Sequence, residues 1–492
     1  MKGNIVLVCF YSPKALGVRY LESALTQAGF SVTLVFFKNF NSTHPKMATA
    51  HELELLADVI RRKNPMAIGL SVMASYYLDA VAAVDKKLRM EFDIPTIWGG
   101  VYPTLFAEKC MERADFVIRG EGEAPFTELA EALYAGTDYT QIPNLTYRTK
   151  DGAIVTNEMR SLMTDLDEYG IPNLGGDKYS IEDDKICHCD PQLGSKSYEI
   201  TGSRGCYFAC SYCSTIALKR LAAKKGTYVR YRAADKMIDE LVLAKKRMKK
   251  LKYIRFWDEI FCDDPEWVDY FVKRYKREIG LPFEIWGHPL RTNLDITRKL
   301  KKAGLFKVVM GIQSGSPYIR REIFNRVETQ EQILEAARIL SECKVPQVIY
   351  DFMLRHPFET HDTLRETLHL CEKLAKPFEL QMHGLNFLPG TDIIQKALDQ
   401  KLVTPEKMQE LLDAPMQEQY NTHWSAVSSD ATMDLIYKQI YLTQFPSLHK
   451  KAKKLGEHPD AAAIDKLHGQ AQKRAKLRYY YKRALLFAKG SI

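Results

Sequence analysis

The chain has 492 residues, 46% of them apolar, and a formal net charge of +9. This length and composition are typical of a globular protein with two to four domains. No uninterrupted apolar stretch approaches the roughly 18 residues of a membrane-spanning helix. The first residues predict a β-strand and not a signal peptide, so we expect a cytoplasmic protein.

Residues 1–150 alternate between strand and helix patterns, which predicts a doubly wound, Rossmann-like α/β domain. The expected strands are 4–10, 32–37, 67–72, 96–98 and 116–118, and the expected helices are 16–28 and 51–63. Ligands bind at the carboxyl ends of the strands in such sheets. The loops expected there are rich in small residues and span 12–17, 71–75, 99–104 and 119–123.

Residues 151–195 are expected to form a linker, because the periodic pattern weakens and Gly170, Pro172 and Gly175-Gly176 indicate turns. The segment contains Cys187-His188-Cys189. Two thiols around one histidine raise the question of a metal site, but no partner pair is visible. We therefore expect a loop or surface feature near the cysteine triplet that follows.

Cys206, Cys210 and Cys213 follow a strand expected at 198–202. Thiolates suit iron-sulfur clusters, and this spacing lets one loop wrap a cluster corner while one iron stays open. The alternatives are a zinc knuckle or three buried cysteines, but a zinc site needs a fourth ligand, and no Cys or His pair follows at a fitting distance. Ten cysteines, three of them clustered, are more typical of reduced, metal-binding thiols than of a disulfide framework.

The spacing Cys206-x3-Cys210-x-Tyr212-Cys213 after a strand resembles the signature of radical S-adenosylmethionine (radical SAM) enzymes. The resemblance implies a 4Fe-4S cluster whose open iron is chelated by the amino and carboxylate groups of SAM. An electron from the cluster then cleaves SAM to a 5'-deoxyadenosyl radical. The resemblance also implies an anaerobic, oxygen-sensitive enzyme and an electron donor such as flavodoxin or ferredoxin.

Residues 196–400 resume the strand and helix alternation and predict a partial or full β/α barrel of the TIM type, with active residues at the carboxyl ends of its strands. The strands expected after the first are 253–257, 284–288, one from Val308 that ends in Gln313-Ser314, 347–354, and a sixth that ends in 388–391. This order is similar to that of radical SAM barrels, so the resemblance extends from residue 1 to about residue 400.

The resemblance makes six residues candidates for SAM contacts, which are Tyr212, Asp258, Glu259, Arg291, Gln313 and Ser314. Asp258-Glu259 stands where these enzymes often have Gly-Gly-Glu. The glycines are absent, but either carboxylate can accept hydrogen bonds from an ammonium. Arg291 could grip a carboxylate or only pair with a nearby helix. Gln313 and Ser314 would meet the ribose or methionyl part of SAM.

The N-terminal loops resemble the cobalamin-binding domain that precedes the barrel in one large radical SAM subfamily, through Gly-Gly-x-x-Pro-Thr at 99–104 and Gly-Glu-Gly-Glu at 120–123. Glycines there let the backbone approach the corrin closely. A Rossmann-like domain for another ligand, or one that has lost its ligand, is the alternative. The resemblance assigns cobalamin contacts to Ser12, Lys14, Gly17, Ser71, Met73, Gly99, Gly100, Val101, Tyr102 and Glu121.

The first of these loops departs from many cobalamin domains, which place a histidine on cobalt with Asp-x-His-x-x-Gly. Here the corresponding residues are 12–17, and Lys14 stands where the histidine would be. A protonated ammonium is not a ligand, so we expect no histidine from this loop on the lower face of cobalt. The departure is usual in the subfamily and favours low-coordinate cobalt that accepts and hands over a methyl group.

Residues 401–492 lie beyond the resemblance and are expected to be helical, with helices at 405–414 and 430–445. From Pro446 onward, twelve Lys or Arg stand against three acidic residues, so this segment alone supplies the net charge of +9. A basic, aromatic helix can lie on an anionic membrane or bind an acidic partner. We favour a solvated helix docked by its apolar stripe. Nucleic acid is not expected, because no separate binding module is present.

The resemblance as a whole implies a cobalamin-dependent radical SAM methyltransferase, which methylates a poorly activated carbon of a small molecule, lipid or protein side chain through methylcobalamin. Cyclisation, ring contraction or another rearrangement without methyl transfer is the alternative reaction. A methylthiotransferase needs three more cluster cysteines in the first domain, which offers only Cys9 and Cys110. A cobalamin-binding or metal-sensing protein without turnover is the alternative outside enzymes.

Overall fold

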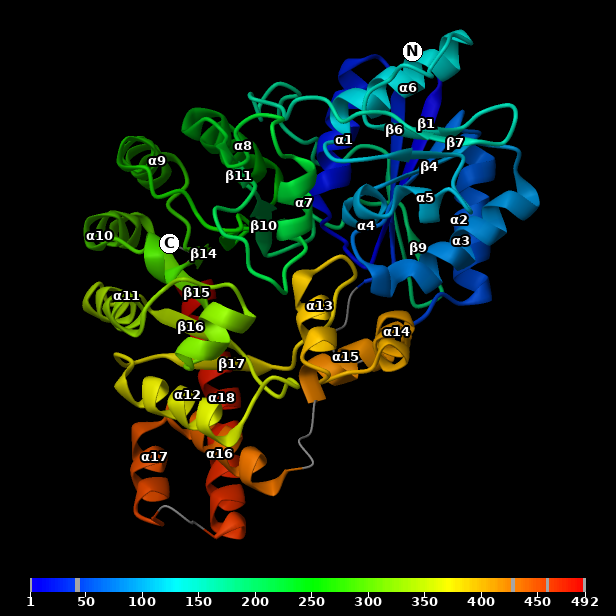
Figure 1. Cartoon of the computed structure of the whole chain (residues 1–492). Coiled ribbons are helices and arrows are strands. Elements are labelled where there is room, and N and C mark those ends of the chain that lie inside the picture. The colour runs from blue at the N-terminus through cyan, green and yellow to red at the C-terminus, as the bar shows by residue number, and fades with distance from the viewer. Residues whose placement is uncertain (1, 40–44, 426–429, 457–459, 490–492) are drawn as a thin grey trace.

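The computed structural model describes residues 2–39, 45–425, 430–456 and 460–489, and contains two main sheets that lie next to each other (Figure 1). A C-terminal group of helices follows the second sheet. Within the described residues, no helix combines the length and the apolar character needed to cross a membrane.

In the described residues, the first sheet has nine strands in the order β7-β6-β5-β4-β3-β1-β2-β8-β9, and β6 (Leu145–Arg148) pairs antiparallel with β5. Its parallel centre has helices on both faces, since α1 and α6 pack on one side and α2 and α3 on the other. The centre consists of β1 (Asn4–Phe10), β2 (Ser31–Phe37), β3 (Ala67–Ser71), β4 (Thr96–Gly99), β5 (Phe116–Ile118) and β8 (Lys178–Glu182), and the helices are α1 (Leu16–Gln27), α2 (Ala50–Lys63), α3 (Leu78–Glu91) and α6 (Glu123–Ala135). This is the doubly wound arrangement expected from the sequence.

The segment 151–195 contributes three strands to this sheet, β7 (Ile154–Thr156), β8 and β9 (Lys185–Cys187). Buried ion pairs attach it to α1. Arg19 donates two hydrogen bonds to Asp190, at 2.7 and 3.0 Å, and Lys178 pairs with Glu22 at 2.5 Å. The segment expected to be a linker is therefore partly built into the edges of the first sheet.

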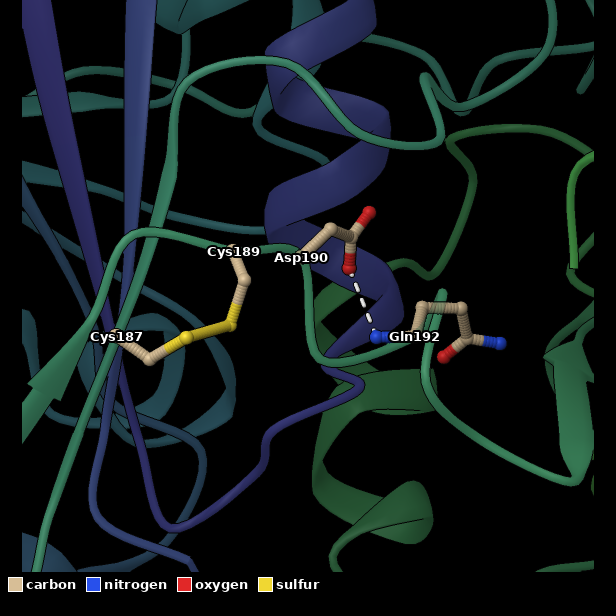
Figure 2. Close-up of a disulfide and its surroundings, with 4 residues drawn as sticks. All are labelled: Cys187, Cys189, Asp190 and Gln192. Carbon is tan, nitrogen blue, oxygen red and sulfur yellow. Dashed lines mark hydrogen bonds between the residues drawn. A yellow bond between two sulfur atoms is a disulfide. The ribbon is translucent and has the colours of Figure 1, made fainter.

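A disulfide joins Cys187 and Cys189 at the end of β9 (Figure 2). Both residues are exposed, and the carboxylate of the neighbouring Asp190 accepts a hydrogen bond from the backbone N–H of Gln192. The prediction of a surface feature is confirmed for this motif. The sequence favoured reduced thiols over a disulfide framework, and this pair is an exception, since the other eight cysteines are free.

The second sheet is a partial barrel of six parallel strands in chain order. The strands are β10 (Ser197–Ile200), β13 (Tyr253–Phe256), β14 (Phe283–Gly287), β15 (Leu305–Gln313), β16 (Gln347–Met353) and β17 (Glu379–His383). The helices that cover it are α8 (Ala234–Arg247), α9 (Pro265–Glu278), α10 (Leu294–Ala303), α11 (Gln330–Glu342) and α12 (His361–Lys373). The sixth strand ends at His383, earlier than expected, and residues 388–391 form a loop that leads into α13 (Asp392–Asp399).

In the part of the chain that the structure describes, five helices follow α13, namely α14 (Pro405–Asp413), α15 (Met416–Ser425), α16 (Ala431–Leu442), α17 (Pro446–Lys453) and α18 (Ala461–Lys489). In Figure 1, α18 (red) passes behind β16 and β17. Arg478 donates a hydrogen bond to the carbonyl of Phe378 at 3.2 Å, and Lys482 donates one to the carbonyl of Pro346. Both carbonyls come just before a strand, so α18 lies across the amino ends of the barrel strands.

Candidate functional site

Cys206, Cys210 and Cys213 lie in one loop after β10, and all three are partly exposed free thiols. The loop requires Gly205, because its φ of 90° is left-handed and a Cβ there would lie 2.2 Å from the carbonyl oxygen of Tyr228. In the described part of the chain, no three Cys, His, Asp or Glu side chains converge as they would on a single metal ion. An iron-sulfur cluster needs no such convergence, because its cysteines bind different irons. The donor set therefore fits a cluster.

Arg326 connects the cysteine loop to the barrel. Its buried guanidinium lies 4.0 Å from the Cys210 sulfur and 3.2 Å from the Tyr212 hydroxyl, and it donates to the Gly311 carbonyl at 2.7 Å. The buried carboxylate of Glu328 accepts a hydrogen bond from its Nε at 2.5 Å. A cation next to a thiolate stabilises the charged form, which suits a loop that binds an anionic cluster.

Asp258 anchors the cysteine loop from the next strand. Its Oδ1 accepts hydrogen bonds from the backbone N–H of Gly202 at 3.0 Å and from the hydroxyl of Ser203 at 2.5 Å. Burial raises the pKa of Asp258 to about 6. Glu259 is exposed and lines a cavity together with Cys213. Of the predicted acidic pair, Glu259 is therefore better placed to meet a ligand.

Gln313 and Ser314 follow each other at the end of β15 but lie in different surroundings. Gln313 has a left-handed φ of 68°, and within the described residues its buried Oε1 has no hydrogen-bond partner. Ser314 is fully buried, and its Oγ accepts a hydrogen bond from the backbone N–H of Ser316 at 3.1 Å. Strained, unpaired groups of this kind cluster at ligand sites. Gln313 is therefore a stronger candidate than Ser314 for direct contact with a ligand.

Arg291 forms an ion pair with Asp263 at 2.5 Å. Its guanidinium also lies 4.2 Å from the centre of the Tyr207 ring. The structure thus gives Arg291 a local partner in the loop before α9, and its contact with SAM stays a prediction.

A cavity of about 280 Å³ opens at the carboxyl ends of the central strands of the first sheet. Gly99 gives it room, since the nearest atom to an added Cβ would be the Ile118 carbonyl oxygen at 3.8 Å. Gly100 has a φ of 111°, and a Cβ there would lie 2.7 Å from the Val72 carbonyl oxygen. The predicted cobalamin residues that line the cavity are Gly17, Ser71, Met73, Gly99, Gly100 and Glu121. This glycine-rich, largely apolar wall fits part of a large organic cofactor.

Ser12 and Lys14, from the first predicted cobalamin loop, do not line this cavity. The Lys14 ammonium donates a hydrogen bond to the Ser197 hydroxyl at 2.7 Å and pairs with Glu199 at 3.1 Å, both on β10. Lys14 therefore connects the first sheet to the barrel. The absence of a cobalt ligand from this loop stays a prediction.

Glu121 forms a second connection between the two sheets. Its carboxylate lies 3.2 Å from Arg204 and 2.9 Å from Arg230, and it accepts a hydrogen bond from the backbone N–H of Met163 at 2.8 Å. Burial opposes ionisation of Glu121, but the two arginines outweigh it and hold its pKa below the ordinary value. Because Arg204 precedes Cys206 by two residues, the Gly-Glu-Gly-Glu loop is attached to the cysteine loop.

A second cavity, of about 250 Å³, lies between the two sheets. Met73, Val101 and Tyr102, three of the predicted cobalamin residues, line its wall on the first sheet, and Cys213 and Glu259 line it on the barrel side. Met73 also lines the first cavity. The structure therefore brings the predicted cobalamin loops and the cysteine loop to one shared space.

Three further polar side chains meet at the ends of β16 and β17. His383 Nε2 lies 3.2 Å from Asp351, and the His423 ring from α15 lies 4.3 Å from the His383 ring. Burial opposes protonation of His383, but Asp351 outweighs it and raises the pKa of His383. Burial, followed by the charge of His383, lowers the pKa of His423 to about 4. These three side chains thus combine a carboxylate, a readily protonated imidazole and a neutral imidazole.

The helix that carries His423 also reaches the first sheet, because the Tyr420 ring lies 5.4 Å from the Tyr76 ring after β3. The sequence predictions did not include Asp351, His383, His423 or Arg326. Asp351 alternates with residues packed against the helices, so a period-two reading of β16 would have marked it as facing the barrel interior. Arg326 gives no such signal, because it lies in a loop distant from the cysteines in sequence.

Two family profiles match the chain, each over one of these sheets. The profile "B12 binding domain" matches residues 5–130, and "Radical SAM superfamily" matches residues 200–371. The chain belongs to the cobalamin-dependent radical SAM enzymes. Its cofactors are a 4Fe-4S cluster, SAM and cobalamin.

Curated relatives of this enzyme include an uncharacterized methyltransferase, PH0819, of Pyrococcus horikoshii, which is 26% identical over 357 residues, 71% of this chain and 72% of that protein. The anaerobic magnesium-protoporphyrin IX monomethyl ester cyclase of Rubrivivax gelatinosus is 25% identical over 65% of this chain and 57% of the cyclase. Cytidylyl-2-hydroxyethylphosphonate methyltransferase of Streptomyces wedmorensis is 22% identical over 66% of each chain. The chain thus spans less than two thirds of the cyclase.

Solved structures with the same fold include the radical SAM methyltransferase TsrM from Kitasatospora setae, with a TM-score of 0.63 at 15% identity over 97% of this chain and all of that one. The cobalamin-dependent radical SAM enzyme OxsB matches with a TM-score of 0.67 at 15% identity, over 97% of this chain and 72% of OxsB. At these identities the likeness concerns the fold alone.

Proposed function

We propose that this enzyme transfers a methyl group from SAM, by way of cobalamin, to a poorly activated carbon. The observation that carries the proposal is the shared cavity, in which Met73 and Tyr102 of the first sheet lie across from Cys213 and Glu259 of the barrel. The relatives named as methyltransferases support this reaction.

In this proposal Cys206, Cys210 and Cys213 hold the cluster. When bound, the cluster and SAM supply a radical that removes a substrate hydrogen, and cobalamin supplies the methyl group. The chain's own residues bind and orient these groups. Tyr212, Glu259 and Gln313 contact SAM, Asp258 and Ser314 hold the loops around it, and Arg291 remains a candidate for a carboxylate.

For cobalamin, we propose that Gly17, Ser71, Gly99 and Gly100 form the cradle in the first sheet, because their backbone lines the cavity there. Met73, Val101 and Tyr102 extend this wall to the space shared with the barrel. Ser12, Lys14 and Glu121 belong to the same loops. The ion pairs of Lys14 and Glu121 hold the first sheet next to the barrel.

Asp351, His383 and His423 are proposed to face the substrate. They combine a carboxylate acceptor with two imidazoles, and α15, which carries His423, also contacts the first sheet through Tyr420. Such a group can orient a substrate hydroxyl or amine by hydrogen bonds. The substrate itself is a small molecule, a lipid or a protein side chain.

Enzymes of this class take electrons from a reductant and act on a substrate. For this chain we propose a flavodoxin or a ferredoxin as the donor and the cytoplasm as the location. We also propose the division into a cobalamin-binding domain at 1–150, a connecting segment at 151–195, a barrel at 196–400 and a helical region at 401–492. Limited proteolysis of the holoenzyme would test these boundaries by the sites of first cleavage.

An assay with methyl-labelled SAM tests the proposed reaction. The chain is reconstituted anaerobically with iron, sulfide and cobalamin and incubated with reductant and an extract of small molecules. Label in a new product, together with deoxyadenosine, supports methyl transfer. Deoxyadenosine with an unlabelled new product would instead support cyclisation or rearrangement, the second candidate, which the cyclase relatives favour. No reductant-dependent deoxyadenosine would indicate a binding protein without turnover.

A further inference from the structure

The net positive charge of this chain comes from its C-terminal segment. Residues 446–492 contain twelve Lys or Arg and three acids, a net charge of +9, which equals the net charge of all 492 residues. Most of these cations lie on α17 and α18. The excess positive charge therefore lies in one part of the fold.

One face of α18 is docked and the opposite face is exposed. Ile464, Ala471 and Arg478 lie on the docked face, where the first two belong to a core cluster shared with α16 and α17. The exposed face follows the same helical period and combines cations with large apolar groups. It includes Lys473, Lys476, Leu477 (69% exposed), Tyr480 (57%) and Tyr481 (62%). Within the described residues, neither lysine has an acidic partner.

The connections around α18 extend this basic face. In a parallel β/α barrel, the last turn of each helix lies at the amino end of the next strand. The exposed cations in or just after these turns are Lys245, Lys246, Arg247, Lys249, Lys250, Lys276, Arg277, Lys302, Lys344 and Lys373. Of the nearby acids, Glu278 pairs with Arg274 and with Arg277 of this set, and Glu372 pairs with Lys453.

We propose that this face, formed by the exposed side of α18 and the helix ends around it, binds an anionic lipid surface. Clustered cations attract anionic lipids, and tyrosine and leucine side chains suit the boundary between headgroups and acyl chains. The proposal does not depend on which reaction the enzyme catalyses.

The position of the face argues against a docked electron donor. Arg478 and Lys482 of α18 bind carbonyls at the amino ends of β17 and β16, whereas the cysteine loop follows the carboxyl end of β10. Because all six strands are parallel, these are opposite ends of the barrel. A donor bound at α18 would be separated from the cluster by the length of the strands. The bilayer would thus anchor the enzyme, with the cavity of the active site facing away from it.

Vesicle flotation of the full-length, cofactor-loaded enzyme tests the proposal. We expect it to float with vesicles of equal parts phosphatidylglycerol and phosphatidylcholine, but not with phosphatidylcholine alone, and to be released by salt. Lys473→Gln/Lys476→Gln should lower partitioning about thirtyfold, because each lysine near an anionic surface contributes about fivefold. Tyr480→Ser/Tyr481→Ser should lower it severalfold.

The matched control is Arg62→Gln/Lys86→Gln, which removes the same charge from exposed positions on α2 and α3. It should float like the parent. An equal loss of vesicle binding in Lys473→Gln/Lys476→Gln and in the control would overturn the proposal, because only the total charge of the protein would then matter. It would also be overturned if the parent failed to float, or if RNA or an acidic flavodoxin bound this face while vesicles did not. Reductant-dependent deoxyadenosine, measured on each variant, reports the reaction separately.

Discussion

Gly205 has no side chain to bind a ligand, yet it shapes the cysteine loop one residue before Cys206. Its left-handed φ and the close approach of the Tyr228 carbonyl oxygen exclude any larger residue without movement of the backbone. Gly194 differs, because an added Cβ there would have no atom within 4 Å.

Gly205→Ala should therefore impair the cluster site. We expect a destabilisation of about 1–3 kcal/mol from backbone strain and a marked loss of iron per chain after anaerobic reconstitution. The matched control is Gly194→Ala, at an exposed loop position with no atom within 4 Å of the added Cβ. It should be neutral or stabilising by about 0.4–1 kcal/mol. Equal iron content in both variants would contradict this role of Gly205.

Arg326 and Glu328 form a buried pair whose members depend on each other. Arg326→Gln should destabilise the fold by about 3–5 kcal/mol, because it leaves the buried Glu328 carboxylate without its partner. Adding Glu328→Gln should recover a large part of this loss. Thermal unfolding under anaerobic conditions measures both effects. A double variant no more stable than the single one would show that the pair has no such coupling.

Glu359 gives the fold a pH dependence. Burial raises its pKa from 4.5 to about 8, so between these values the unfolded chain is ionised at this position and the folded chain is not. Its contribution to stability is therefore present below pH 4.5 and is lost as the pH rises towards 8. The Tm of the wild type minus that of Glu359→Gln should fall across this range. A constant difference would show that Glu359 titrates normally.

Candidate site residues could be selected from the sequence where a short motif contains them. The cysteine spacing and Gln313 are of this kind, since each lies in a short recognisable stretch. Roles that depend on distant partners could not be predicted. Asp258 lies in the expected place, but only the fold shows that it binds Ser203 and Gly202. Arg326 was not predicted either, because its partners Cys210 and Tyr212 are distant from it in sequence.

At the scale of elements, buried apolar segments agree with expectation, whereas short exposed strands at the sheet edges do not. β1 matches its predicted bounds, because an apolar run of this length has little alternative. β5 (Phe116–Ile118) matches as well, because its three residues are all apolar and buried, whereas β7 and β9 are mostly exposed edge strands and were not predicted. Neither was α15, whose His423 reaches His383 in the barrel.

The loop between β1 and α1 allows a direct test of the cobalt environment. Lys14 is occupied with Ser197 and Glu199, so we expect no protein histidine on the lower face of bound cobalamin. The cobalt(II) form, studied by electron paramagnetic resonance in enzyme with ¹⁵N-labelled histidine, should show the same hyperfine pattern as unlabelled enzyme. A change in the pattern on labelling would identify a histidine ligand and contradict the prediction.

At the scale of the whole molecule, the two ends of the barrel differ in character. The carboxyl end meets the first sheet, where Glu121 holds Arg204 and Arg230 and the cavity contains Met73 and Cys213. The amino end carries α18 and most of the net charge. The location of the charge and the presence of two domains could be predicted from the sequence. The position of the basic helix across the amino end of the barrel could not, because that contact joins segments about a hundred residues apart, as between Arg478 and Phe378.

The most direct test of the account is reductant-dependent cleavage of SAM by the anaerobically reconstituted chain. The wild type should form 5'-deoxyadenosine and show the broad visible absorbance of an iron-sulfur cluster. Cys206→Ala, Cys210→Ala and Cys213→Ala should each lose both, whereas Cys343→Ala, at a cysteine outside the loop, should keep both. Cleavage that persists in any of the three loop variants would contradict the assignment of these cysteines as the ligands of the cluster.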